Sequence, residues 1–144
     1  MGSPETRDDF NDSNPEKPKK HWDDEEVLLD LRGDYPNAYK GHLLLIKLFE
    51  EEGTPEKFWE FIAKKEYEPI PTFDEYIKRR NKKYSYEVSY NIANPNLQSA
   101  TEKIEILIKA ANQAREAQNL QKFKEKLLEL DKFVKSLPDD LKNI

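Results

Sequence analysis

Residues 40–65, KGHLLLIKLFEEEGTPEKFWEFIAKK, form the most apolar stretch of this chain. Their large apolar side chains fall into two groups on either side of Gly53: Leu43, Leu44, Leu45, Ile46, Leu48 and Phe49, then Phe58, Trp59, Phe61 and Ile62. Leu45, Leu48 and Phe49 are three and four residues apart, so they share one side of a helix. Leu44 and Ile46 widen that side, and we therefore expect the middle of this helix to be deeply buried.

The residues around Gly53 predict a pair of helices. The first spans about 36–52, with Pro36 suited to its first turn, and Gly53 ends it. The second starts directly afterwards, because Thr54 is a good N-cap and Pro55 fits the first helical turn. Such a tight break indicates an antiparallel or steeply crossed pair. Burial of each large side chain contributes about 2 kcal/mol, so this pair is the expected folding centre.

On the N-terminal side, a short helix is predicted over 23–32. Asp23, Asp24, Glu25 and Glu26 occupy its start, where negative charge suits the helix dipole. These carboxylates lack the alternating oxygen ligands and the glycine turn of a calcium loop, so we interpret them as a helix start. Residues 1–20 contain three prolines, many charges and one large apolar residue, which predicts a disordered tail.

On the C-terminal side, Pro69 and Pro71 make residues 66–71 a connector. Thr72 and Glu75 then form a capping box for a helix over 73–83. The end of this helix is strongly basic, with Lys78, Arg79, Arg80, Lys82 and Lys83. The helix dipole favours cations there, which is a structural explanation for part of this charge.

Residues 84–92, YSYEVSYNI, carry the clearest strand pattern in the chain. Large side chains alternate with small or polar ones over nine residues, at Tyr84, Tyr86, Val88, Tyr90 and Ile92. A lone strand cannot pair its own backbone groups, so it needs a partner. That partner is a cryptic strand near 67–71, a second copy of the chain or another protein. The alternative is an extended linker whose tyrosines pack over helices.

The last part of the chain predicts a helical hairpin over 95–137. Apolar stripes run through 95–118 and 120–137, but the two stripes are out of phase, which favours a turn near Gln118 and Asn119. No glycine or proline marks this turn, so one long helix is the alternative.

Together these segments predict a mainly all-α fold, a small bundle of five to six helices with a C-terminal helical hairpin and an extended segment at 84–92. The expected domain covers 21–137. It consists of helices over 21–83, the extended segment that links them to the hairpin at 84–94, and the hairpin itself at 95–137. Residues 138–144 are expected to form a short tail.

Composition narrows the function classes. The 144 residues suffice for one domain, with 36% hydrophobic and 37% charged residues and a net charge of −5. This charge does not favour nucleic acid or an anionic membrane. There is no cysteine, no apolar run long enough to span a membrane and no secretory signal, so we expect a cytoplasmic protein. The nucleus is the alternative, because Lys17, Lys19 and Lys20 form a short basic cluster.

Few residues suit catalysis. The only histidines are His21 and His42, and His42 adjoins the most apolar helix, where a packing role is expected. Phosphate-binding glycine loops and a glycine-flanked serine are absent from the sequence. We therefore predict a protein without enzymatic activity, cofactor or metal.

Two functional hypotheses follow from the sequence. The first is a protein–protein interaction module, serving as an adaptor, regulator or assembly subunit, whose segment 84–92 binds a partner sheet through Tyr84, Tyr86, Val88 and Tyr90. The second is a nucleic-acid-binding regulatory protein that uses the basic and aromatic block 73–90, with Lys78, Arg79, Arg80, Lys82 and Lys83 on phosphates. Self-association through the C-terminal hairpin is compatible with both.

Overall fold

The computed structural model describes residues 17–144, and the predicted disorder of residues 1–16 lies outside this range. The described residues form six α-helices, two short strands and a terminal 3₁₀ turn, which confirms the mainly helical bundle. In chain order these elements are β1 (Lys19–Trp22), α1 (Asp24–Arg32), α2 (Asn37–Glu52), α3 (Pro55–Lys64), α4 (Phe73–Lys83), β2 (Glu87–Tyr90), α5 (Pro95–Glu116), α6 (Leu120–Lys135) and η1 (Leu141–Asn143). Within this range, no helix combines the length and the apolar character needed to cross a membrane.

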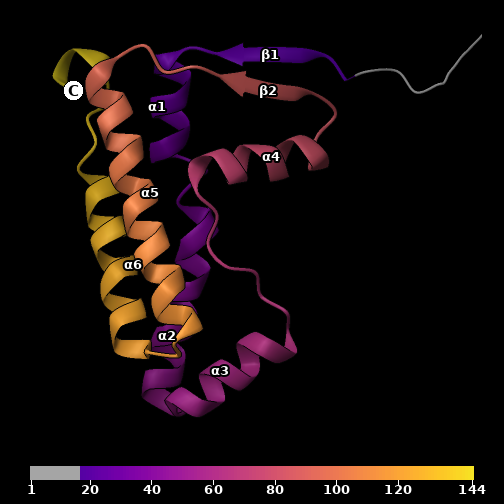
Figure 1. The fold of residues 1–144 in the computed structure, drawn as a ribbon, viewed down its shortest axis with the longest axis vertical. Helices are drawn as coiled ribbons and strands as arrows, with labels where there is room; N and C mark the ends of the chain where they lie inside the picture. The colour runs from indigo at the N-terminus through magenta and orange to yellow at the C-terminus, as the bar shows by residue number, and fades with distance from the viewer. Residues whose placement is uncertain (1–16) are drawn as a thin grey trace, which may run out of the picture.

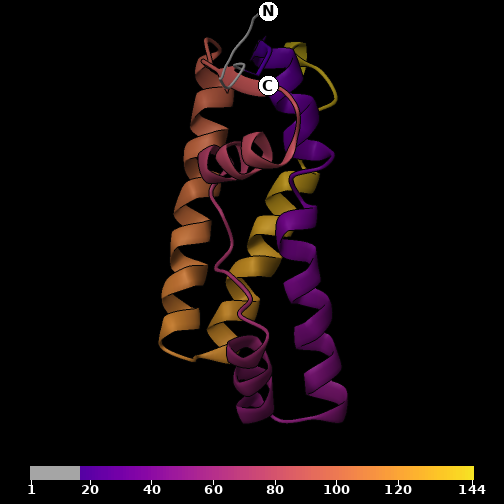
Figure 2. The ribbon, with the colours of Figure 1, turned by 90° about the vertical axis from the view of Figure 1, so that its right-hand side faces the viewer.

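The helices form an elongated bundle. Figures 1 and 2 show α1 and α2 following one another along the long axis, with α5 and α6 beside them. Helix α3 lies across one end, whereas α4 and the two strands lie towards the other end. The segment between α3 and α4 runs along the outside of the bundle, and this segment forms one wall of the site described below.

Local side-chain chemistry explains where the helices begin. Thr54 accepts a hydrogen bond from the backbone N–H of Lys57, and Thr72 forms the predicted capping box with Glu75. At the start of α1, Asp23 and Glu26 form a second capping box, which gives these carboxylates the predicted structural role.

The predicted C-terminal hairpin is confirmed. Helix α5 ends at Glu116, Gln118 adopts a left-handed conformation with φ of 55°, and the Asn119 side chain caps α6. One long helix is therefore excluded. The short tail predicted for 138–144 is in fact anchored: η1 forms there, Leu141 and Ile144 pack against the core, and Arg32 forms an ion pair with Asp139.

The strand at 87–90 has its partner inside the chain. β1 and β2 form a two-stranded parallel sheet with Lys19 opposite Glu87 and Trp22 opposite Tyr90. Three expectations are thereby corrected: the partner strand is not near 67–71, it is not supplied by another molecule, and the tail does not extend to residue 20. β1 carries no alternating apolar pattern, since its side chains are mostly exposed, so the sequence offers no local signal for it.

One apolar core runs the length of the bundle and includes residues from all six helices and β2. In α2 the buried side is formed by Tyr39, His42 and Ile46. The expected deep burial of the leucines is wrong for Leu44 and Leu48, which are 70% and 46% exposed. The apolar residues of helix α2 extend beyond one side of the helix, and packing against α6 and α3 leaves these two leucines outside.

Candidate functional site

The tyrosine-rich segment 84–92 is largely committed to contacts within the molecule. Val88 is 4% exposed, Tyr86 and Tyr90 are half-buried, and only Tyr84 is well exposed. The Tyr90 ring packs edge-on against Phe73 at 5.3 Å, and its hydroxyl donates to Asp74 at 3.3 Å. The alternation predicted which side chains point inward, but not that they would be used internally.

The free edge of β2 is also occupied. The side-chain amide of Asn81 donates to the Val88 carbonyl at 2.9 Å and accepts from the Val88 N–H at 2.8 Å. The two backbone groups of Val88 that a docking strand would use are thus already paired. Main-chain docking of a partner strand on Val88 would have to displace Asn81.

Arg80 lies at the centre of an aromatic cluster. Its guanidinium carbon is 4.8 Å from the ring centre of Tyr84 and 5.3 Å from those of Tyr86 and Trp22. It also donates a hydrogen bond to the Tyr86 hydroxyl at 3.0 Å. These rings therefore face the protein's own cation, an arrangement that stabilises the end of α4.

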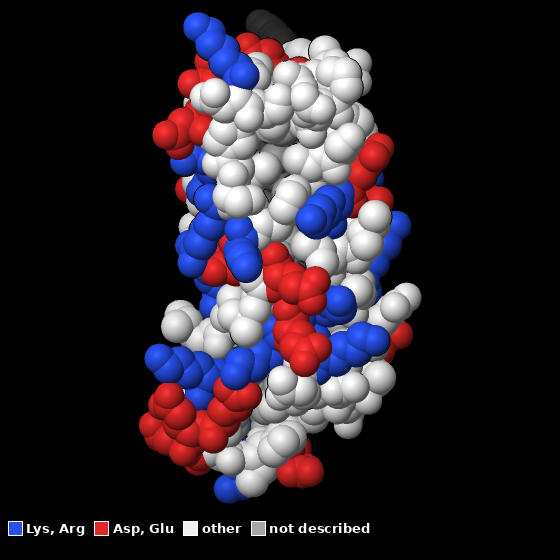
Figure 3. Space-filling view, turned by 90° about the vertical axis from the view of Figure 1, so that its left-hand side faces the viewer, with Lys and Arg blue, Asp and Glu red and all other residues white. Residues whose placement is uncertain are grey.

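The other predicted phosphate contacts are only partly free. Lys78 pairs with Asp74 at 3.4 Å and Arg79 pairs with Glu68 at 2.9 Å. Lys82 and Lys83 are exposed and have no ion pair among residues 17–144. On the opposite side of the molecule from α4, Lys and Arg side chains alternate with Asp and Glu, and no single sign of charge covers that face (Figure 3).

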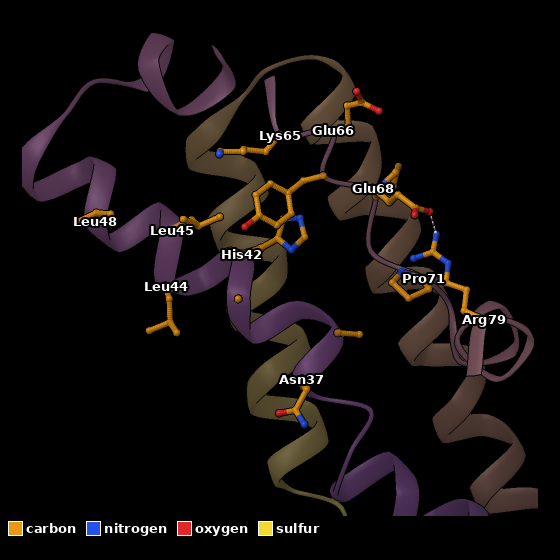
Figure 4. A pocket seen from close by; sticks show the side chains of 14 residues that line it. Asn37, His42, Leu44, Leu45, Leu48, Lys65, Glu66, Glu68, Pro71 and Arg79 are labelled. Atoms are coloured by element: carbon orange, nitrogen blue, oxygen red, sulfur yellow. Dashed lines mark ion pairs between the residues drawn. The ribbon is translucent and has the colours of Figure 1, made fainter. Parts of the chain in front are cut away.

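The more developed site lies between α2 and the segment that joins α3 to α4. We call residues 65–72 the connector and this depression, of about 660 Å³, the connector groove. Ala38, Gly41, Leu45 and Leu48 line it at helical spacing along α2, and Tyr67, Pro69 and Pro71 line the opposite wall. Figure 4 shows Leu45 pointing from α2 towards the connector, and Leu44 lies at the edge of the same groove.

The connector is held rigidly against the bundle by side chains of α5 and by Tyr35. Arg115 donates to the carbonyls of Tyr67 and Glu68, the latter at 2.8 Å. The Asn112 amide pairs with both backbone groups of Ile70 at 3.2 and 3.0 Å. The Tyr35 hydroxyl donates to the Pro71 carbonyl at 2.9 Å. The wall of the groove is therefore preformed.

His42 lies at the base of the groove and is buried, as its predicted packing role requires. Its ring packs edge-on against Tyr67 and Phe123, with ring centres 5.8 and 6.1 Å away. Burial, and then the positive charge of Arg115, lower the pKa of His42 to about 4. The imidazole is accordingly neutral near pH 7.

The lining of the connector groove suits the burial of apolar side chains. Charged groups also line it: Arg79 and Glu68 form their ion pair at one part of the groove, and Lys65 and Glu66 lie elsewhere along it (Figure 4). No cluster of three or more potential metal-ligating side chains occurs among residues 17–144.

No motif in the sequence predicts this groove. The one indication in the sequence is the number of large apolar residues at 43–49. One buried side of a helix needs fewer, so some of them must lie on an exposed side. Comparisons with family models, with curated proteins and with solved structures found no match to this chain.

Proposed function

We propose that this protein is a non-enzymatic protein–protein interaction module, acting as an adaptor, regulator or assembly subunit, that binds an apolar segment of another protein in the connector groove. The observation that carries the proposal is the exposed apolar side of α2, with Leu45 and Leu48 facing a wall already fixed by Arg115 and Asn112. A preformed wall lowers the entropic cost of binding, because little has to be ordered when the partner arrives.

An amphipathic helix is the partner segment that fits best. Such helices dock their apolar side chains, spaced three and four residues apart, into grooves of this kind. Gly41 provides the space, because a Cβ atom placed there would have no neighbour within 4 Å. The mixed charges at the rim favour a partner helix with charges of both signs beside its apolar side.

The connector groove takes the place of segment 84–92 in this proposal. Binding through Tyr84, Tyr86, Val88 and Tyr90 was expected because the strand lacked a partner. In the structure β1 pairs with one edge of β2, and the Asn81 side chain bonds the backbone of Val88 on the other edge. Tyr84, which is 46% exposed, is the most accessible member of that set.

The test is to fill the groove without damaging the helix. A photo-crosslinking amino acid in place of Leu48, used in extract of the source cells, should give a discrete crosslinked protein. Gly41→Met should abolish this crosslink, because its side chain occupies the groove. Gly41→Ala is the matched control: it also replaces glycine in a helix, which stabilises α2 by about 0.5–1 kcal/mol, but leaves the groove open.

The outcome separates the proposal from its alternatives. A crosslink that persists in Gly41→Met, or one formed equally from position 106 on the exposed side of α5, would contradict binding in the connector groove. The same extract should be compared before and after nuclease treatment, since the alternative function requires nucleic acid.

Nucleic-acid binding is the second candidate, favoured by the exposed Lys82 and Lys83 beside Tyr84. It predicts salt-dependent binding to single- or double-stranded oligonucleotides, weakened by a Lys82→Glu, Lys83→Glu double variant. Absence of binding at low salt would remove this candidate.

A further inference from the structure

A second groove lies between α2 and α6, next to the connector groove. Its volume is about 840 Å³, and Leu43, Leu44, Ile46 and Leu128 form its apolar lining. Leu44 and Leu128 are 70% and 47% exposed, so two large aliphatic side chains face solvent in this α2–α6 groove. Leu128 does not line the connector groove and Gly41 does not line the α2–α6 groove, which makes the two surfaces separable by mutation.

Two of the acidic groups that line the α2–α6 groove are already paired. Lys124 of α6 pairs with Glu50 of α2 at 2.8 Å, and Lys135 pairs with Asp131 at 2.8 Å. Asp131 also accepts a hydrogen bond from the Tyr39 hydroxyl at 3.3 Å. The contacts of Tyr39 and Glu50 with α6 show that the two helices run antiparallel here. Because these four charges are satisfied within the molecule, they contribute little to the choice of a partner.

The remaining charges of the groove lie on α2 and form an ordered pattern with Leu44. Lys40, Lys47 and Glu51 line the groove, are exposed and have no ion pair among residues 17–144. Together with Leu44 they follow one another at intervals of four, three and four residues, so they share one side of the helix. Along α2 the order is therefore cation, leucine, cation, anion, over about 16 Å.

We propose that the α2–α6 groove binds a helix of another protein, one side of which carries anion, leucine, anion and cation at the same spacing. Its leucine packs against Leu44 and Leu128. Its two acidic residues face Lys40 and Lys47, and its basic residue faces Glu51. A helix is the matching element, because its side chains recur at the three- and four-residue intervals that α2 presents.

The order of the charges selects this partner over a second copy of the chain. The two unpaired lysines are four and three residues from Leu44, whereas Glu51 is seven residues away, so the apolar centre is flanked by positive charge. A helix with acidic residues around its leucine is complementary to that arrangement. An antiparallel second copy is not, because the alignment that pairs Lys40 with Glu51 also places Lys47 against Leu44. The proposal does not depend on the function assigned to the connector groove.

Fluorescence anisotropy with a designed peptide provides the test. The labelled probe has about 18 residues and carries glutamate, leucine, glutamate and lysine at intervals of four, three and four, with further leucines on the same side and alanine and glutamine elsewhere. A second probe carries the same residues in reverse order, because a helix can lie along α2 in either direction. One of the two should bind the full chain with a dissociation constant below about 100 μM. Replacement of its two glutamates by lysine should weaken binding at least about tenfold.

Variants of the protein show where the probe binds. Leu128→Glu should weaken binding at least about tenfold, because it places a charge in the apolar lining. Ile106→Glu is the matched control, since Ile106 is a 66% exposed aliphatic residue outside both grooves and should leave binding unchanged. Gly41→Met should also leave it unchanged, because it fills only the connector groove. Circular dichroism verifies that each variant keeps its helix content.

A charge exchange tests the pairing of the glutamates with the two lysines. The Lys40→Glu, Lys47→Glu double variant should lose the acidic probe and bind the lysine-containing probe to within about threefold of the original affinity. No binding of either probe, binding lost in Gly41→Met but kept in Leu128→Glu, or a double variant without preference for the lysine-containing probe would overturn the proposal. Self-association of the protein that Leu128→Glu abolishes would identify a second copy as the occupant and would also overturn it.

Discussion

His42 connects the base of the connector groove to its wall. The distance from His42 Nε2 to Arg115 Nη1 is 3.4 Å, and Arg115 in turn holds the connector carbonyls. A guanidinium group only donates hydrogen bonds, so the imidazole must present its lone pair on Nε2 and carry its proton on Nδ1. Protonation of Nε2 would place two positive charges against each other.

The low pKa of His42 predicts a loss of stability in mild acid. Between about pH 4 and pH 6.5 the unfolded chain binds a proton at this histidine and the folded chain does not. Acid therefore favours the unfolded state. The free energy of unfolding falls as the pH is lowered from 6.5 to 4, and His42 accounts for at most about 3 kcal/mol of this decrease. Urea unfolding across this range should show a weaker pH dependence in His42→Gln than in the natural protein.

His21 provides the control for this measurement. It is exposed, and His21→Gln should retain the pH dependence of the natural protein. Carboxylates also titrate in this range, but they are common to all three proteins, so the difference between the variants isolates His42. Identical pH profiles for His42→Gln and the natural protein would contradict the assignment.

At the scale of the element, the side chains of two asparagines form the hydrogen bonds that a neighbouring strand would otherwise provide. Asn81 pairs with both backbone groups of Val88, and Asn112 does the same for Ile70 in the connector. Each amide supplies one donor and one acceptor, which is the same pair that a strand residue offers. These side chains pair the backbone groups of the buried residues Ile70 and Val88 without a large sheet.

Asn81→Ala should weaken the attachment of β2 to α4. It leaves the buried N–H and C=O of Val88 without partners, so we expect a loss of about 2 kcal/mol in the free energy of unfolding by urea. The Val88 amide should also exchange its hydrogen faster in the variant. The matched control is Asn91→Ala, an exposed asparagine in the same segment, for which a change within about 0.5 kcal/mol is expected. Unchanged exchange at Val88 would show that Asn81 does not close this edge.

At the scale of the whole molecule, the single core couples the two ends of the bundle. Phe123 is fully buried and packs against the rings of His42, Phe58 and Trp59, while Val88 at the other end belongs to the same core. The β1–β2 sheet and α3 lie at opposite ends of the long axis (Figure 1). A continuous core of this kind predicts that both ends unfold together.

The two tryptophans allow this cooperativity to be measured. Trp22 lies in β1 and Trp59 in α3, so Trp22→Phe and Trp59→Phe each leave one fluorescent reporter at one end. Both reporters should give the same urea midpoint. Phe123→Ala should lower the free energy of unfolding by about 3–5 kcal/mol at both reporters, because it opens a cavity in the shared core. Separate midpoints would show that the bundle unfolds in two parts.

The sequence by itself determined those features that depend on neighbours a few residues away. The capping residues Thr54 and Thr72 marked two helix starts, and the change of apolar phase near Gln118 located the hairpin turn. The alternation over 84–92 also indicated which side chains of β2 point inward. These interactions are local, so composition and spacing suffice to predict them.

Only the tertiary structure decided what each surface meets. β1 is a polar segment that becomes a strand by pairing with β2, sixty-eight residues further along. Helix α2 carries leucines on more than one side, and contacts with α3 and α6 determined that Ile46 is buried and Leu44 exposed. The connector groove likewise exists because Arg115 and Asn112 hold residues that are distant in sequence. Burial depends on which elements pack against each other. The spacing of apolar residues within a single helix or strand does not specify which element it packs against.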